Sequence, residues 1–201
     1  IKCAFPFPIN NAAELLDYTQ KENKSISEIV YANEISMRPE AEVHSELLRI
    51  WHTMLECMYI GCHSEGILPG GLNVRRRAFD MHQNLIGLST YDSPQSWLEE
   101  IRKTEVKFRQ ILKWVSCFAL AVNEVNAALG RVVTAPTNGS AGVIPAVLMY
   151  YMVIEKTGDV LLEYAAHVVV PGDYSGHAWN ATDDPWLFGP SDGTYKGALT
   201  M

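Results

Sequence analysis

The sequence lacks the long apolar run that a membrane-spanning helix requires. Such a helix takes about 18 or more consecutive apolar residues, and the longest apolar run here, residues 143–154, is too short. The chain also does not open with the basic, apolar and small-residue pattern of a secretory signal. We therefore expect no membrane association and a location in the cytoplasm.

Cysteines are few and dispersed, at positions 3, 57, 62 and 117. Without an export signal, this usage indicates reduced thiols and no disulfide framework. Charge is also modest, since 19% of the residues are charged and the formal net charge is −7. That balance excludes a nucleic-acid-binding surface of the usual basic kind. The only basic cluster, Arg75–Arg77, is more typical of a solvated helix end.

Several catalytic motifs are absent. The sequence contains neither a nucleophile elbow nor a phosphate-binding P-loop. A pyridoxal phosphate enzyme needs a Schiff-base lysine near its ligand loop. The nearest candidates, Lys113 and Lys156, do not lie in such a loop, so we predict no pyridoxal phosphate.

Hydrophobic residues make up 48% of the 201 residues, enough for one sizeable core. The pattern predicts a helix from residue 12 to 23 after Asn10 or Asn11, with Glu14 as a capping-box partner. A second helix is predicted from Ser25, with Glu28 at the matching offset, and a third from Pro39 to about Ile60. An apolar stripe on that third helix comprises Val43, Leu47, Ile50, Trp51, Met54 and Met58.

The middle of the chain continues in helices. Residues 61–71 carry four glycines and a proline and are predicted as a loop, followed by a helix over 74–86. Apolar residues then recur every three or four positions from Ser93 to Leu129, with Gly130 placed to end the run. One straight helix of that length would be about 50 Å long, so we expect a bend or break. The apolar positions are Trp97, Ile101, Phe108, Ile111, Leu112, Val115, Phe118, Ala119, Val122 and Val125.

The last helix is predicted over residues 139–155, with Pro145 kinking it or lying in its first turn. No strand alternation is visible in residues 9–155, so the fold class is predicted to be all-α. From residue 171 the sequence is rich in Gly, Pro, Asp and Trp without a period. We therefore divide the chain into a helical region, 1–170, and an irregular tail, 171–201.

The loop RVVTAPTNGSAG, residues 131–142, is the first candidate site. A turn rich in Gly, Ser, Thr and Asn that runs into a helix N-terminus presents backbone N–H groups and partial positive charge, which suit a carboxylate or phosphate. A capped helix start with glycines for tight packing also explains the pattern, and composition alone favours this second interpretation.

Two further groups are candidates. Asn123 and Asn126 lie on one face of the preceding helix beside Glu124, and they either tie down the loop or face a polar pocket. Cys57, Cys62 and His63 suggest a zinc or iron site, but two cysteines at this spacing without a second pair are weak evidence for one. Buried core thiols are the preferred interpretation.

Two longer runs carry a family resemblance. The segments WVSCFALAVNEVNAALGRVVTAPTNGSAGVIPAVLMYY (114–151) and GCHSEGILPGGLNVRRRA (61–78) closely resemble the α, or catalytic, region of bacterial iron–sulfur L-serine dehydratase. Residues 5–34 resemble the start of that region in the single-chain form. The three segments occur in the family's order and span roughly residues 3–166.

The resemblance implies an all-helical catalytic domain that eliminates water from L-serine, giving pyruvate and ammonia. It also implies a [4Fe–4S] cluster with one iron that acts as a Lewis acid on the serine hydroxyl. The 134–142 loop would hold the substrate carboxylate or amine, and Glu65 and the arginines that follow it would line the same cleft. The implied substrate-binding residues are Thr134, Thr137, Asn138, Gly139, Ser140, Asn123 and Glu65, and the catalytic base is not identified.

The cluster ligands of the family lie in a helical segment and a cysteine pair beyond this loop, and the sequence contains no match to either. We therefore assign no metal ligand to Cys3, Cys57, Cys62 or Cys117. The chain is expected to be part of a homo-oligomeric enzyme whose β domain and cluster segment lie elsewhere, and to be weakly active or inactive alone. The alternative is a non-catalytic helical module that binds small molecules or serves assembly.

Overall fold

The structure, a computed structural model, describes residues 5–104, 106–128 and 138–155, with the side chains of α7 described from residue 141 onward. It contains helices throughout and no β-strand within these ranges, which confirms the all-α prediction. The predicted tail, 171–201, lies outside the described residues, so the division at residue 170 stays a prediction. The helices are α1 (Ala12–Glu22), α2 (Ile26–Met37), α3 (Glu40–Cys62), α4 (Ala78–Ile86), α5 (Pro94–Lys103), α6 (Phe108–Ala127) and α7 (Asn138–Met149).

The first two helices begin where their capping residues predict. The Asn11 side chain accepts the Glu14 backbone N–H at 3.0 Å at the start of α1. The Glu14 carboxylate, however, accepts the backbone N–H of Asn10 rather than that of Asn11. At α2 the predicted capping box is complete, because Ser25 and Glu28 each accept the other's backbone N–H.

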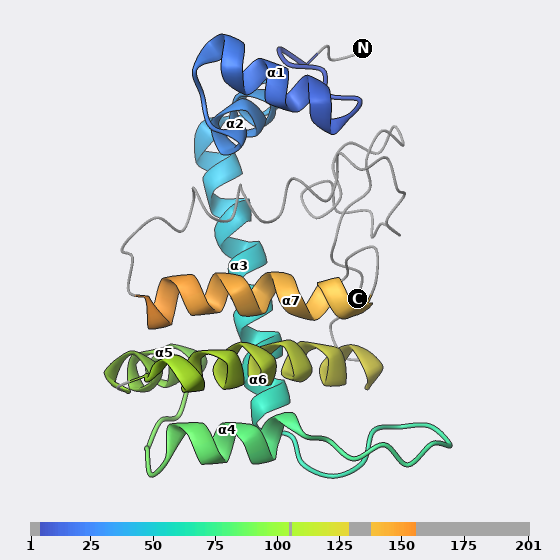
Figure 1. Cartoon of the computed structure of the whole chain (residues 1–201), viewed down its shortest axis with the longest axis vertical. Helices are drawn as coiled ribbons and strands as arrows, with labels where there is room; N and C mark the ends of the chain where they lie inside the picture. The colour runs from blue at the N-terminus through green and yellow to red at the C-terminus, as the bar shows by residue number, and fades with distance from the viewer. Residues whose placement is uncertain (1–4, 105, 129–137, 156–201) are drawn as a thin grey trace.

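The 23-residue helix α3 forms the long axis of the molecule (Figure 1). All six residues of its predicted apolar stripe are buried. Pro39 lies at the N-cap position, and the helix continues two residues beyond the predicted end, to Cys62. Helices α4, α6 and α7 lie one above another and cross α3, with the starts of α4 and α7 on the same side (Figure 1).

The long apolar segment is broken, as its length predicts. Helix α5 starts at Pro94 behind a Ser93 cap and ends at Lys103, and α6 starts at Phe108 and ends at Ala127. The shared core includes Trp97, Trp114 and Phe118, which are fully buried. Two stripe residues depart from the prediction, since Phe108 and Leu112 are 79% and 67% exposed in the first turns of α6. The predicted terminator Gly130 lies outside the described residues.

The predicted helix over 74–86 is wrong in its first turn. Residues 74–76 pair with residues 66–68 instead, through an antiparallel bridge between Ile67 and Arg75. The Leu68 N–H donates to the Val74 carbonyl at 2.8 Å, and the Arg76 N–H donates to the Gly66 carbonyl at 2.9 Å. These backbone groups are therefore satisfied by the partner segment, and α4 begins only at Ala78.

The final helix contains Pro145 in its interior, not in its first turn, and passes into a π-helical turn, Tyr150–Ile154. No helix in the described part of the chain is long and apolar enough to cross a membrane.

Candidate functional site

The two segments that resemble the catalytic region, residues 61–78 and 114–151, are in contact in the fold. Helices α3 and α7 both pack against the C-terminal half of α6. Gly61, near the end of α3, packs so closely against α6 that an added Cβ would lie 2.6 Å from the Ala121 Cα. On α7, a Cβ at Gly142 would lie 2.5 Å from the Ala119 carbonyl oxygen. Only glycine allows these approaches, so both helices are held against a single turn of α6.

Between α3 and α4 the chain forms a hairpin, residues 64–77, that projects from the helices (Figure 1). Gly66 and Gly70 have φ angles of +96° and +115°, which glycine adopts without strain, and Asn73 has a φ of +51°. Glu65 lies exposed at the base of this hairpin, next to Gly66. The glycines are therefore needed for the turn, whatever else the segment does.

A carboxylate from α6 anchors the base of the hairpin. The Oε1 atom of Glu124 accepts the Arg77 N–H at 2.6 Å and the Ala78 N–H at 3.2 Å. Glu124 is only 5% exposed, and its Oε2 atom is buried without a hydrogen-bond partner in the described structure. The start of α4 is thus fixed to α6 by a charge-assisted contact.

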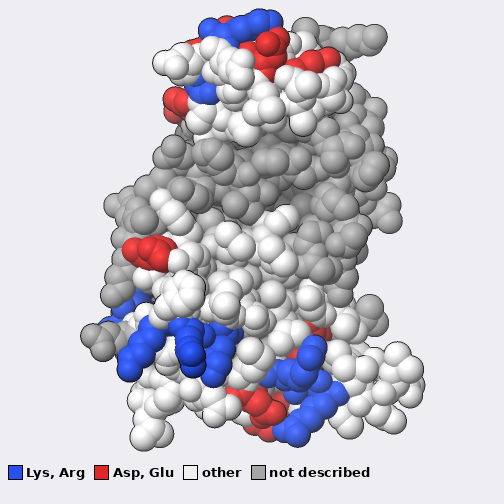
Figure 2. Space-filling model, in the orientation of Figure 1, with Lys and Arg blue, Asp and Glu red and all other residues white. Residues whose placement is uncertain are grey.

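The three arginines of the hairpin base differ in environment. Arg75 is exposed and forms an ion pair with Asp80 at 2.8 Å. Arg77 is exposed, whereas Arg76 is half-buried and its Nη1 atom is buried with no partner that the described residues supply. Lys and Arg gather at this end of the face shown in Figure 2. The expectation of a merely solvated helix end therefore fails for Arg76.

The predicted substrate-binding residues are placed only in part. Asn138, Gly139 and Ser140 form the first turn of α7, with side chains outside the description, and Thr134 and Thr137 lie outside the described residues altogether. Asn123 is half-buried beside that first stretch of α7, because a Cβ at Gly142 would lie 2.8 Å from its Oδ1 atom. That Oδ1 atom has no hydrogen-bond partner in the described part of the chain. Asn123 and the α7 start are therefore brought together, while no hydrogen bond or ion pair joins Glu65 to Asn123 in the described part of the chain.

Sequence reasoning missed the role of Glu124. Glu124 lies in a helix whose neighbouring positions Val122 and Val125 are core residues, and a carboxylate on such a face needs a partner. Helix α4 also needs an acceptor at its start, because its N-cap residue is Arg77 and not Ser, Thr, Asp or Asn. The distance of 47 positions between Arg77 and Glu124 hides the connection.

A family model described as serine dehydratase alpha chain matches residues 21–169. The chain is 40% identical over 146 residues to the L-serine dehydratase of Haemophilus influenzae, 39% identical to L-serine dehydratase 1 of Escherichia coli and 44% identical to the L-serine dehydratase of Streptomyces coelicolor. Each alignment covers 73% of this chain. The chain belongs to the serine dehydratase alpha chain family. It spans about 29% of the length of these relatives.

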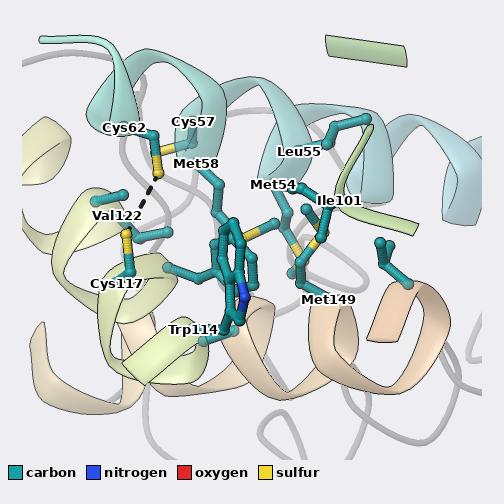
Figure 3. Packing of buried hydrophobic residues seen from close by; sticks show 14 of the residues in the cluster. Met54, Leu55, Cys57, Met58, Cys62, Ile101, Trp114, Cys117, Val122 and Met149 are labelled. Atoms are coloured by element: carbon teal, nitrogen blue, oxygen red, sulfur yellow. Dashed lines mark hydrogen bonds between the residues drawn. The ribbon is translucent and has the colours of Figure 1, made fainter. Parts of the chain in front are cut away.

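Three cysteines of the chain are described, and all are buried without a disulfide. Cys62 and Cys117 approach each other at 3.8 Å between their sulfur atoms, as Figure 3 shows beside Trp114 and Met58. Burial raises the pKa of Cys57 to about 12 and that of Cys62 well above its ordinary range. Such thiols stay protonated in the metal-free chain.

These cysteines do not fit an iron–sulfur cluster, which takes three or four converging thiolates. The Cys117 sulfur, moreover, lies 3.4 Å from the Ala78 carbonyl oxygen as a hydrogen-bond donor within the core. Among the residues that the structure describes, no three His, Cys, Asp or Glu side chains are grouped to hold a metal ion. The buried-thiol interpretation therefore accounts for Cys57, Cys62 and Cys117.

The His63 ring hydrogen-bonds to Tyr59 and Tyr91 and does not form a metal site with Cys57 and Cys62. Its Nδ1 atom lies 2.6 Å from the Tyr59 carbonyl oxygen and its Nε2 atom 2.8 Å from the Tyr91 hydroxyl. Nδ1–H therefore donates to the carbonyl, and the Tyr91 hydroxyl donates to Nε2. Both ring nitrogens are occupied, so the residues do not support the alternative of a zinc or iron protein.

Proposed function

We propose that this chain is the substrate-binding part of the catalytic region of an L-serine dehydratase. The observation that carries the proposal is the 39–44% identity, over 73% of the chain, to proteins named L-serine dehydratase. The reaction is the β-elimination of water from L-serine, and the aminoacrylate that forms gives pyruvate and ammonia. This activity is proposed for the whole enzyme, of which the chain supplies one part.

In the proposal, the start of α7 and the loop before it bind L-serine. The N-terminus of a helix carries partial positive charge and unpaired N–H groups, which suit the substrate carboxylate. Asn138, Gly139 and Ser140 supply these groups, and Thr134 and Thr137 add hydroxyl groups. Asn123 supports the site from α6 with a buried amide oxygen that has no partner in the described structure, and Glu65 contributes from the hairpin.

The [4Fe–4S] cluster implied by the resemblance remains part of the proposal for the whole enzyme only. It would supply the Lewis acid that assists departure of the serine hydroxyl. Because the described cysteines do not fit it, we assign its ligands to parts of the enzyme outside this chain. The role left to this chain is to bind and orient the amino acid.

Binding of L-serine to the purified chain tests the proposal. At a serine concentration about ten times the dissociation constant, ligand binding raises the melting temperature by about 3–6 °C. We expect Asn138→Ala to abolish this shift, because the first turn of α7 then loses its side-chain amide. Asn84→Ala, at an exposed asparagine of α4, is the matched control and should keep the shift.

A differential scanning fluorimetry series with L-serine and D-serine provides the measurement. If millimolar L-serine leaves the melting temperature of a cooperatively melting chain unchanged, the proposal is wrong for this chain. A shift that Asn138→Ala leaves intact would place serine somewhere other than the α7 start.

A further inference from the structure

Two large apolar side chains at the start of α6 lie exposed, although the apolar stripe predicts them in the core. Phe108 and Leu112 are 79% and 67% exposed. Residues four positions apart lie on the same face of a helix, so the two side chains form one apolar surface. Covering such a surface removes it from water, which favours a partner there.

Three basic residues border this apolar surface. Lys107, Arg109 and Lys113 are exposed, and among the described residues no acidic side chain forms an ion pair with any of them. On the face shown in Figure 2, Lys and Arg side chains gather over α5 and the start of α6. We call residues 107–109, 112 and 113 the α6 patch. A partner that fits it is acidic and carries large apolar side chains.

A short segment of this chain has the composition that fits the α6 patch. Residues 183–188 read DDPWLF, so two adjacent carboxylates are followed, after one proline, by three large apolar side chains. Tryptophan and other aromatic side chains are frequent anchors of interfaces because they bury a large area. The segment and the α6 patch are therefore complementary both in charge and in apolar surface.

The last described turn of the chain lies close to the α6 patch. Helix α7 runs antiparallel to α6 (Figure 1), and the π-helical turn that follows it, Tyr150–Ile154, contacts both α5 and α6. Glu155 is therefore on the side where α6 begins. At about 3.3 Å per residue, the chain between residues 155 and 183 is long enough to reach the patch. Such a tether gives an effective concentration of about millimolar, so that even a weak contact is populated.

We propose that the α6 patch is the docking surface for residues 183–188 of the same chain. The two carboxylates of the segment face the basic residues of the patch, and its three apolar side chains cover Phe108 and Leu112. This docking is independent of serine binding, and it gives part of the predicted tail, 171–201, a place on the helices.

Photo-crosslinking in the full chain tests this docking. With p-benzoylphenylalanine in place of Leu187, we expect crosslinks, mapped by mass spectrometry, to fall mainly on residues 107–113 of the same chain. The double variant Phe108→Ala/Leu112→Ala should lower their yield about tenfold, because the apolar anchor points are lost. Both positions are exposed, so the core is unchanged.

Val143→Ala/Val147→Ala is the matched control. These two valines are also apolar, four positions apart and exposed, at 51% and 45%, but they lie on α7. Their replacement should leave the crosslink yield within about twofold of the parent.

Charge reversal tests the electrostatic part of the docking. Lys107→Glu with Arg109→Glu should lower the yield about tenfold, and adding Asp183→Lys with Asp184→Lys should restore it. Acidic residues at a helix start are compatible with the helix dipole, so α6 is expected to stay folded. Restoration by the exchanged charges does not follow from a general effect on folding.

Three results overturn the proposal. Crosslinks scattered over the chain without preference for residues 107–113 show that the segment is not docked. A yield unchanged in Phe108→Ala/Leu112→Ala shows that it docks elsewhere. Crosslinked dimers whose yield rises with protein concentration show that the patch receives a second copy and not the segment of its own chain.

Discussion

At the scale of single residues, His82 shows how the core sets the ionisation of a side chain. It is fully buried, and its Nε2 atom accepts the indole N–H of Trp97 at 2.8 Å. The neutral ring therefore carries its hydrogen on Nδ1, which has no hydrogen-bond partner in the described structure. Burial, with a smaller contribution from the nearby His63, lowers the pKa of His82 from 6.5 to about 4.

This pKa predicts a loss of stability in acid. Between pH 6.5 and about pH 4 the unfolded chain binds a proton at His82 that the folded chain does not, so the free energy of unfolding falls as the pH falls. The full effect is roughly 3 kcal/mol at pH 4. The free energy of unfolding, measured by urea denaturation from pH 7 to pH 4, should fall with pH in the parent and fall less steeply in His82→Phe.

His52→Phe, at an exposed position of α3, serves as the control and should keep the slope of the parent. His82→Phe also removes the acceptor for Trp97, so its stability at pH 7 is expected to be lower. The comparison therefore concerns the slopes alone. Equal slopes in the parent and His82→Phe would show that His82 is protonated in the folded chain.

At the scale of helices, most boundaries are predictable because their signals are local. Ser25 with Glu28, and Ser93 with Pro94, each fix a helix start within four residues of sequence. The start of α4 was misplaced because its determinants are not local. They are the pairing of Arg76 with Gly66 and the cap from Glu124, and neither follows from a helical period.

The close crossing of α3 and α6 predicts a strong effect at Gly61. In Gly61→Ala the new methyl group would collide with the backbone of Ala121, and backbone atoms cannot rotate away. We expect the free energy of unfolding to fall by about 2–3 kcal/mol. Urea denaturation should show a lower midpoint at an unchanged slope.

Gly71→Ala is the control, because a Cβ at Gly71 has no atom within 4 Å. Its free energy of unfolding should stay within about 0.5 kcal/mol of the parent. A Gly61→Ala chain as stable as Gly71→Ala would mean that α3 and α6 are farther apart than the structure places them.

At the scale of the whole molecule, this chain corresponds to only one part of its relatives, since it spans about 29% of their length. Its described cysteines are core residues, and the family alignment over residues 21–169 leaves most of each relative unmatched. The proposed activity and the predicted homo-oligomer both concern an assembly larger than the residues described.

We therefore predict that the chain alone binds no complete [4Fe–4S] cluster. After anaerobic reconstitution with iron and sulfide, protein-bound iron and sulfide should be well below four per chain, and L-serine should not be turned over. The physical reason is that Cys57, Cys62 and Cys117 are buried thiols of the core, and no group of three possible ligands in the described part of the chain is arranged to hold a metal ion. Cys57→Ala should leave the iron content unchanged.

A stoichiometric cluster spectrum together with pyruvate formation would contradict this prediction and would require ligands within the chain.

The sequence by itself determined the helical class, the break before α6 and the segments on which the family resemblance rests. These features follow from periodicity, capping residues and motifs that act over short stretches of chain. Only the tertiary structure decided which side chains serve those segments. Glu124 reaches α4, Asn123 lies beside α7, and Cys62 meets Cys117 because α6 packs between helices distant in sequence. Such contacts depend on how helices cross, which no local pattern specifies.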